Sequence, residues 1–212
     1  TSTTTKIWVR TAASMEVNIS YQQKGSEAIQ QTPTVVTNLT DDFTAKIELI
    51  DLKPGVEYVY WVHVDGQAVT QAGTTSFETA PDGPSTFSVA FGSCMKYAFS
   101  STMPVFNSIL AEAPQILLMI GDNMYANSTL PPVLKHFYLR VRTVESYAAV
   151  LANTATWATW DDHDYTGNNT DAKSPGKENS LEAFERYWAN PSHGSDEKPG
   201  VWTSFIWGDV EF

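Results

Sequence analysis

Residues 115–125 read QILLMIGDNMY, and this stretch decides the fold of the second half of the chain. Its first six residues are almost all apolar, which is typical of a strand that is buried on both faces of a parallel sheet. Gly121 then supplies a turn former, and the polar residues Asp122, Asn123 and Tyr125 follow at once. Because ligands bind beyond the carboxyl ends of such strands, we expect these side chains to line a functional site.

The segments around this stretch predict the rest of an α/β domain. Strand patterns lie at 87–91 and 155–160. Helical patterns lie at 103–112, 132–140, 144–152 and 178–188. Strands that alternate with helices predict βαβ units and a mostly parallel sheet covered on both faces. The last segment, 201–212, predicts two strands around a turn at Gly208 and Asp209. Because its second strand stops at Phe212, we expect the chain to be a fragment of a longer domain.

The first eighty residues have a different pattern. Between Lys6 and Thr79, short runs alternate apolar and polar residues and are separated by turn formers, which predicts a β-sandwich. The segment 52–58, which ends in Tyr58, is similar to the tyrosine corner of a fibronectin type III module. Two prolines and a glycine at 80–85 indicate the boundary between the two parts.

Composition excludes several classes of protein. The chain has 212 residues, 42% of them hydrophobic, and a formal net charge of -11. This acidic balance argues against nucleic-acid binding, which depends on clusters of Lys and Arg. Apolar runs are too short to predict a membrane span. A single cysteine, Cys94, excludes a disulfide within the chain.

Three polar clusters follow the three predicted strands of the second half. They contain the candidate ligands Cys94, Asp122, Tyr125, Asp161, Asp162, His163 and Asn168. Thiolate, phenol, imidazole and carboxylate groups together suit a mixed site, in which iron takes the softer and phenolic donors and a harder ion takes oxygens. Taken singly, the residues allow ordinary interpretations: Cys94 as a small buried residue, the run of Asp161, Asp162 and Asp164 as a solvated turn, and Asn168 as a turn or glycosylated residue.

The motifs themselves resemble a known family. Gly-Ser-Cys at 92–94, Gly-Asp-x-x-Tyr at 121–125 and Thr-Trp-Asp-Asp-His-Asp at 159–164 are similar to the alkaline phosphatase D (PhoD-like) metallophosphatases. The resemblance implies a mixed fold, with a fibronectin III-like β-sandwich over 1–81. An incomplete α/β metallophosphatase domain of the calcineurin-like type would then occupy 82–212.

The resemblance also implies an activity and a set of ligands. It implies one Fe(III) and one or two Ca(II), with a metal-activated water that hydrolyses phosphate monoesters, diesters or both. The implied roles are iron binding by Cys94 and Tyr125, bridging by Asp122, calcium binding by Asp161 and Asn168, and a further ligand in Asp162. His163 is then a candidate catalytic residue, either as a proton donor or by orienting a neighbouring ligand.

The sequence departs from the family pattern at its end. Family members supply a further Asp, His and Arg after the segment that ends at Phe212, so we expect this chain alone to bind metal poorly. Its expected partners are small phosphate esters and a possible C-terminal fragment that completes the domain. A secreted, periplasmic or cell-surface location is expected. Two alternatives stay open: a non-catalytic binding or scaffold protein with a truncated phosphatase-like domain, and a phosphodiesterase on the same core.

Overall fold

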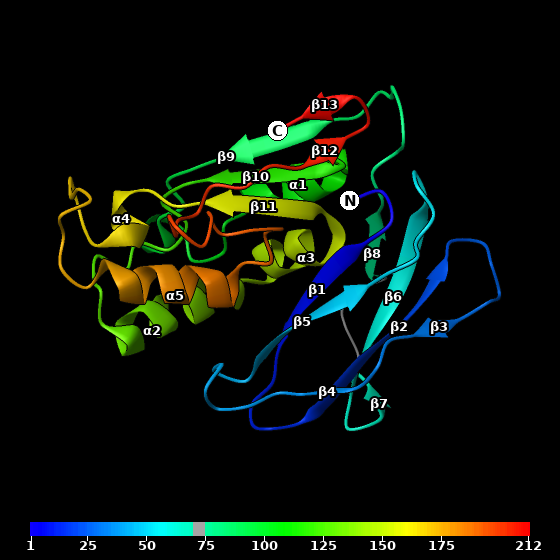
Figure 1. Cartoon of the computed structure of the whole chain (residues 1–212), viewed down its shortest axis with the longest axis horizontal. Helices are drawn as coiled ribbons and strands as arrows, with labels where there is room; N and C mark the ends of the chain where they lie inside the picture. Colours follow the sequence, from blue (N-terminus) through cyan, green and yellow to red (C-terminus); the bar gives the residue numbers. More distant parts are fainter. Residues whose placement is uncertain (70–74) are drawn as a thin grey trace. The chain divides into compact units, whose positions relative to one another are not determined.

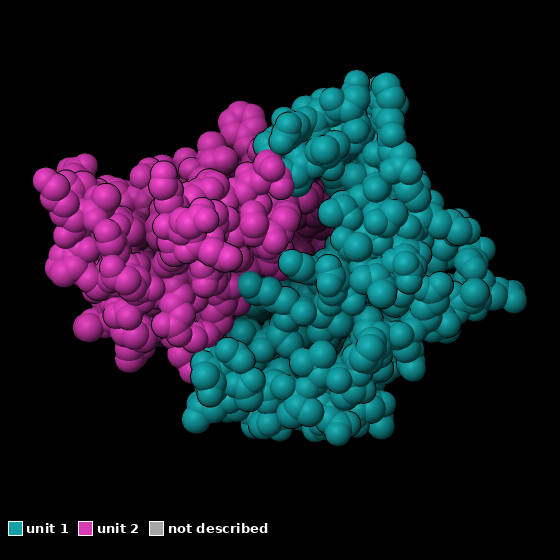
Figure 2. All heavy atoms as spheres, in the orientation of Figure 1, with its two compact units in different colours: residues 1–86, 205–212 teal, residues 87–204 magenta. Residues whose placement is uncertain are grey.

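The computed structural model describes residues 1–69 and 75–212, which form two compact units (Figure 2). The first unit consists of Thr1–Thr86 together with Phe205–Phe212, and the second of Phe87–Ser204. The sequence pattern assigned residues 82–86 and 205–212 to the second part, whereas the structure groups them with the sandwich. This grouping depends on packing between segments that are distant in sequence, and a local sequence pattern does not predict such packing.

Two sheets make up the sandwich of the first unit. The strands are β1 (Thr5–Arg10), β2 (Glu16–Gln23), β3 (Gln30–Gln31), β4 (Val35–Val36), β5 (Thr44–Leu49), β6 (Glu57–Val64), β7 (Gln67–Ala68) and β8 (Thr75–Glu78). One sheet pairs β1 with β5, and the other is built around β2 and β6, which β3, β4, β7 and β8 extend. All of these pairs are antiparallel.

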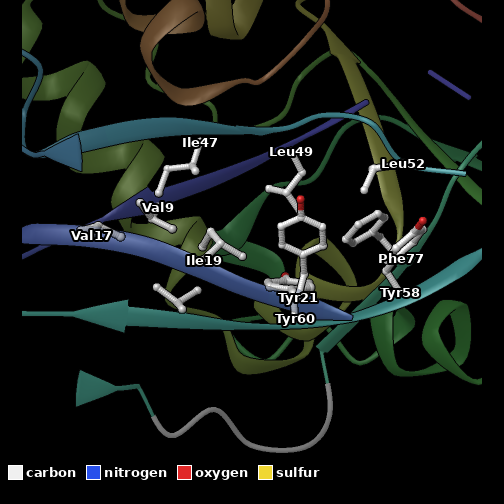
Figure 3. Packing of buried hydrophobic residues seen from close by; sticks show 11 residues of the cluster. Val9, Val17, Ile19, Tyr21, Ile47, Leu49, Leu52, Tyr58, Tyr60 and Phe77 are labelled. Carbon is white, nitrogen blue, oxygen red and sulfur yellow. The ribbon is translucent and has the colours of Figure 1, made fainter. Parts of the chain in front are cut away.

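The core of the first unit lies between these two sheets (Figure 3). Alternate residues of β2, namely Val17, Ile19 and Tyr21, are buried, as the period-two pattern predicts. In Figure 3, Ile47 and Leu49 of β5 point toward the strand that carries Ile19 and Tyr21. The sequence therefore predicts correctly which face of β2 is apolar and buried.

The predicted tyrosine corner is confirmed in its geometry. The hydroxyl of Tyr58 accepts a hydrogen bond from the backbone N–H of Lys53 at 2.9 Å, and the ring stacks on Phe77 with centroids 5.4 Å apart. The side chain thus ties β6 to the turn that precedes it. Membership of the fibronectin III class remains a prediction from the sequence.

A parallel sheet forms the centre of the second unit. Its strands β9 (Val89–Gly92), β10 (Ile116–Ile120) and β11 (Ala155–Thr159) lie in the order β11-β10-β9. Ile116 and Leu117 are adjacent in β10 and so face opposite sides, yet both are buried. The central strand is therefore covered on both faces, as its continuous apolar run predicts.

Helices follow the strands in the expected alternation. They are the 3-10 turn η1 (Tyr97–Phe99), α1 (Val105–Glu112), α2 (Pro131–Arg142), α3 (Glu145–Asn153), α4 (Asp162–Tyr165) and α5 (Lys177–Tyr187). Aromatic contacts join them: Phe106 of α1 meets Tyr147 of α3 at 4.6 Å between ring centroids, and Tyr138 of α2 stacks on Tyr187 of α5 at 4.5 Å. No helix in the described part of the chain is long and apolar enough to cross a membrane.

The last residues form a short hairpin. Strands β12 (Ile206–Trp207) and β13 (Val210–Glu211) pair antiparallel, and Gly208 occupies the turn with φ +64°. The turn predicted at Gly208 and Asp209 is confirmed, but the first strand is shorter than predicted. Because Gly208 needs a positive φ, the turn position could be read from the sequence more easily than the strand ends.

Candidate metal centre

Three loops converge at the carboxyl end of the parallel sheet. The strands β9, β10 and β11 run the same way, and their arrowheads point toward α4 in Figure 1. The loops after β10 and β11 lie close together at Gly121, which has φ +110°. A Cβ atom placed on Gly121 would lie 2.7 Å from Cβ of Asp161. A glycine at this position therefore lets two of the three polar clusters meet.

The buried carboxylate of Asp122 lies at the middle of the site. It is 5% exposed, and its Oδ2 lies 3.6 Å from Sγ of Cys94, which is an exposed cysteine. The backbone holds this pair together, because Cys94 N–H donates to the carbonyl of Gly121 at 3.2 Å and Met95 N–H donates to that of Asp122 at 2.9 Å. The structure thus brings the first and second clusters into contact.

Tyr125 completes this side of the site. Its phenol forms hydrogen bonds with Asp122 and Cys94. Desolvation is the largest cause that raises the pKa of Tyr125 above its ordinary value, followed by these two hydrogen bonds. A phenol, a thiol and a carboxylate that already lie this close could share a Lewis-acidic cation, which would favour their deprotonated forms.

The backbone is strained at these three residues. Cys94, Asp122 and Tyr125 have φ values of 58°, 53° and 56°, in the left-handed region that side chains other than glycine rarely adopt. Each such residue costs on the order of 1–3 kcal/mol, so the surrounding structure must enforce it. Three of the eleven non-glycine residues with positive φ in the described part of the chain are therefore candidate ligands, and such strain is a feature of functional sites.

The third cluster contributes from the start of α4. Asp122, Asp162 and His163 each offer a ligand atom, and these atoms lie within 4.8 Å of one another. Oδ2 of Asp162 also accepts from the backbone N–H of Asn169 at 2.5 Å, which fixes the carboxylate. The sequence predicts His163 as a proton donor or orienting residue, whereas in the structure it lies among the groups that could hold a cation.

The two predicted calcium ligands, Asp161 and Asn168, are both exposed. Asp161 is exposed and caps α4, because its Oδ1 accepts from the backbone N–H of Asp162 at 2.9 Å. Asn168 is exposed in the loop that follows α4. Asp161 is not part of the group formed by Asp122, Asp162 and His163, and the calcium-binding roles of Asp161 and Asn168 stay predictions from the sequence.

Asp164 has a role that the sequence reasoning missed. It is 1% exposed, and its carboxylate accepts from the backbone N–H groups of Asn123 at 2.7 Å and Met124 at 2.9 Å, and from the Asn123 side chain at 3.0 Å. Burial raises the pKa of Asp164 to about 6, although these hydrogen bonds oppose the shift. The interpretation of residues 161–164 as a solvated acidic turn is therefore wrong for Asp164, which ties the loop after β11 to the loop after β10.

Two further residues lie around Tyr125 and His163. The Tyr125 and His163 rings stack with centroids 4.4 Å apart, and Nζ of Lys96 lies 5.5 Å from the Tyr125 ring centroid. Asn127 contacts His163 through its side chain, with 2.5 Å between Oδ1 and Nδ1. The sequence offered only spacing as a signal for Lys96 and Asn127, since each lies two residues after a predicted ligand.

The residues present fit a bound cation. Asp122 Oδ1 and Asn123 Oδ1 are both buried, and neither has a hydrogen-bond partner in the described part of the chain. A buried carboxylate oxygen without a partner is unfavourable unless a cation or a donor satisfies it. Oxygen, sulfur and imidazole donors around it match the ligand preferences of first-row transition metals and of harder ions.

Comparisons with known proteins agree with this architecture. A family model described as "Domain of unknown function (DUF7800)" matches residues 1–81. No curated protein sequence matches the chain. A solved structure of PhoD superposes with a TM-score of 0.78 at 14% identity, over 99% of this chain and 48% of that one. Purple acid phosphatase PPD1 from yellow lupin (Lupinus luteus) seeds superposes with a TM-score of 0.70 at 15% identity, over 100% of this chain and 42% of that one.

These likenesses define the fold. The chain has a mixed, sheet-rich fold like part of PhoD and of a purple acid phosphatase, and it spans less than half the length of either chain. At 14% and 15% identity, the superpositions show shared architecture alone.

Proposed function

We propose that this chain is part of a PhoD-like metallophosphatase, in which it supplies most of the metal ligands of a phosphate-ester hydrolase. The observation that carries the proposal is the environment of Asp122. One of its carboxylate oxygens is buried without a partner, the other faces Cys94, and Asp162 and His163 lie within ligand distance. A carboxylate with donors on two sides is suited to bridge two cations about 3.5–4 Å apart.

The proposed ligands divide by chemistry into two groups. Cys94 and Tyr125 offer a thiolate and a phenolate, and these suit Fe(III). Asp162 and His163 offer a carboxylate and an imidazole within ligand distance of Asp122, and Asp161 and Asn168 remain proposed Ca(II) ligands. When bound, such cations supply Lewis acidity and a water of lowered pKa.

The residues of the chain then have defined tasks. Asp122 is the proposed bridge between the two groups of ligands. Asp164, on α4, accepts hydrogen bonds from the loop that carries Asp122 and so holds this loop against α4. The ring of His163 stacks on Tyr125 and is therefore restricted in its rotation. Lys96 places a positive charge beside the Tyr125 ring, where it would attract a phosphoryl oxygen. Fixed ligands and nearby cationic groups are what phosphoryl transfer requires, because most of its catalysis is positioning and charge stabilisation.

The proposed substrates are small phosphate monoesters and diesters, and the proposed location is secreted, periplasmic or at the cell surface. Both follow from the resemblance of the three motifs to PhoD-like enzymes. A solved structure of PhoD shares the fold over nearly the whole of this chain, as the resemblance of the motifs predicts.

The test combines metal analysis with hydrolysis assays on the full protein that contains this chain. We expect bound iron and calcium, and turnover of p-nitrophenyl phosphate, bis-p-nitrophenyl phosphate or both. Asp122→Ala should lose metal and activity together, and Cys94→Ser should lose the thiolate contribution to the visible charge-transfer absorption of iron, while that of the Tyr125 phenolate remains. Unchanged activity in Asp122→Ala would rule out the bridging role.

A further inference from the structure

Asn127 and His163 contact each other twice. The backbone N–H of Asn127 donates to the carbonyl of His163 at 3.1 Å, and Oδ1 of Asn127 lies 2.5 Å from Nδ1 of His163. The first contact holds the two backbones together, so the short side-chain contact has a fixed geometry. The side chain of Asn127 thus contacts the imidazole of His163 at Nδ1.

The amide of Asn127 has a defined orientation. Its Nδ2 donates to the backbone carbonyl of Tyr125 at 3.3 Å, which leaves Oδ1 to face the histidine ring. An amide oxygen accepts hydrogen bonds and cannot donate them, so Nδ1 of His163 must carry the hydrogen. In the neutral ring the lone pair then lies on Nε2.

Backbone conformation and stacking support this arrangement. Asn127 has φ +49°, a left-handed conformation that asparagine tolerates better than most residues. Tyr125 stacks on the imidazole at 4.4 Å between centroids, which hinders a flip of the ring that would exchange the two nitrogens. Residue type, backbone and neighbouring ring therefore favour the same tautomer.

We propose that Asn127 is a positioning residue, which fixes the tautomer of His163 and thereby makes Nε2 the nitrogen available to a cation shared with Asp122 and Asp162. The part of this inference that concerns the cation rests on the proposed function. The part that concerns the tautomer rests only on the contacts of Asn127, so the two can fail separately. Hydrogen-bond partners of this kind orient histidine ligands and raise their basicity.

Nitrogen-15 NMR of the imidazoles tests the tautomer directly in the metal-free protein. The chain has only four histidines, so His163 can be assigned by comparison with a His163→Gln variant. At a pH where the ring is neutral, we expect the wild-type spectrum to show a hydrogen on Nδ1 and a lone pair on Nε2. A spectrum with the hydrogen on Nε2 would overturn the proposal, whatever the protein hydrolyses.

A pair of substitutions then separates positioning from packing. Asn127→Asp keeps an acceptor oxygen for Nδ1–H, so it should retain the tautomer and bind Zn²⁺ or Fe³⁺ at least as tightly as the wild type. Asn127→Leu removes the acceptor and should weaken metal binding about 10-fold to 100-fold, as measured by titration calorimetry. Asn107→Leu, at an exposed position on α1, serves as the control and should bind metal normally.

Two results of the metal titrations would contradict the proposal. If the Asn127 amide in fact donated to the ring, it would favour the hydrogen on Nε2, and Asn127→Leu would bind metal more tightly than the wild type. Equal affinities for the wild type and Asn127→Leu would show that the tautomer does not depend on this residue. In both cases, the hydrolysis assays decide the proposed phosphatase function independently.

Discussion

Gly121 and Asp161 approach each other so closely that a methyl group on Gly121 would lie 2.7 Å from Cβ of Asp161. The backbone of the loop after β11 is also near, with the Asp161 nitrogen at 3.2 Å from the same point. Because backbone atoms cannot move aside as a long side chain can, the contact sets the spacing of the two ligand-bearing loops.

The first prediction follows from this contact. Gly121→Ala should destabilise the protein by at least about 1–3 kcal/mol, because φ +110° is strained for any side chain, and it should weaken metal binding by pushing the loops apart. Denaturant titration and metal titration measure the two effects. Gly92→Ala is the matched control, since a Cβ there meets nothing within 4 Å. Similar results for both variants would contradict the spacing role.

Substitution of Asp164 should mainly lower the stability of the protein, whereas substitution of Asp162 should mainly weaken metal binding. Asp164→Asn replaces an acceptor by a donor facing N–H groups, so we expect a loss of about 1–3 kcal/mol for each N–H left without an acceptor, even in chelator. Asp162→Asn lies at the partly exposed start of α4 and should weaken metal binding while it changes the stability of the metal-free protein less. Thermal unfolding in EDTA separates the two, and equal stability losses would contradict these roles.

Lys96 is predicted to contribute to substrate binding. Lys96→Ala should raise KM for a doubly charged phosphate monoester roughly tenfold, the size of one hydrogen bond to a charged group, and should raise KM for a singly charged diester less. Metal content should not change. Lys96→Arg should restore most of the loss because the charge remains, and Lys6→Ala, on β1, is the control. A kcat defect without any change in KM would argue against this role.

Tyr58 is predicted to stabilise the first unit. Tyr58→Phe should lower the free energy of unfolding by about 1–3 kcal/mol, because the N–H of Lys53 loses its acceptor in a half-buried place. Tyr21→Phe is a fair control: its ring lies 6.3 Å from that of Tyr58, and its hydroxyl has no hydrogen-bond partner among the described residues. Equal losses in the two variants would show that the corner contributes nothing of its own.

The sequence predicted the parts of the fold that depend on local pattern. The apolar run 115–120, the alternation in β2 and the residues around Tyr58 each reflect the burial of one or both faces of a strand, which a short window of sequence records. The meeting of Cys94, Asp122 and Tyr125 was also predictable, because parallel neighbouring strands end at one edge.

The sequence could not show which acidic side chain after β11 turns inward. Asp161, Asp162 and Asp164 are chemically alike, and only the single turn of α4 sends the last of them into the interior while the first caps the helix. The pairing of Asn127 with His163 spans 36 residues and likewise depends on the fold. Contacts of this range carry no periodic signal, so spacing alone could not assign them.

The hydrogen bonds of Asp164 have one more consequence. They join the loops after β10 and β11 through the protein's own N–H groups, so the candidate site is preorganised and does not need an ion to assemble it. A chelator should therefore strip such a protein without unfolding it. Reloading would then be governed by which ion is in excess, and a protein emptied in this way would be open to binding the wrong metal.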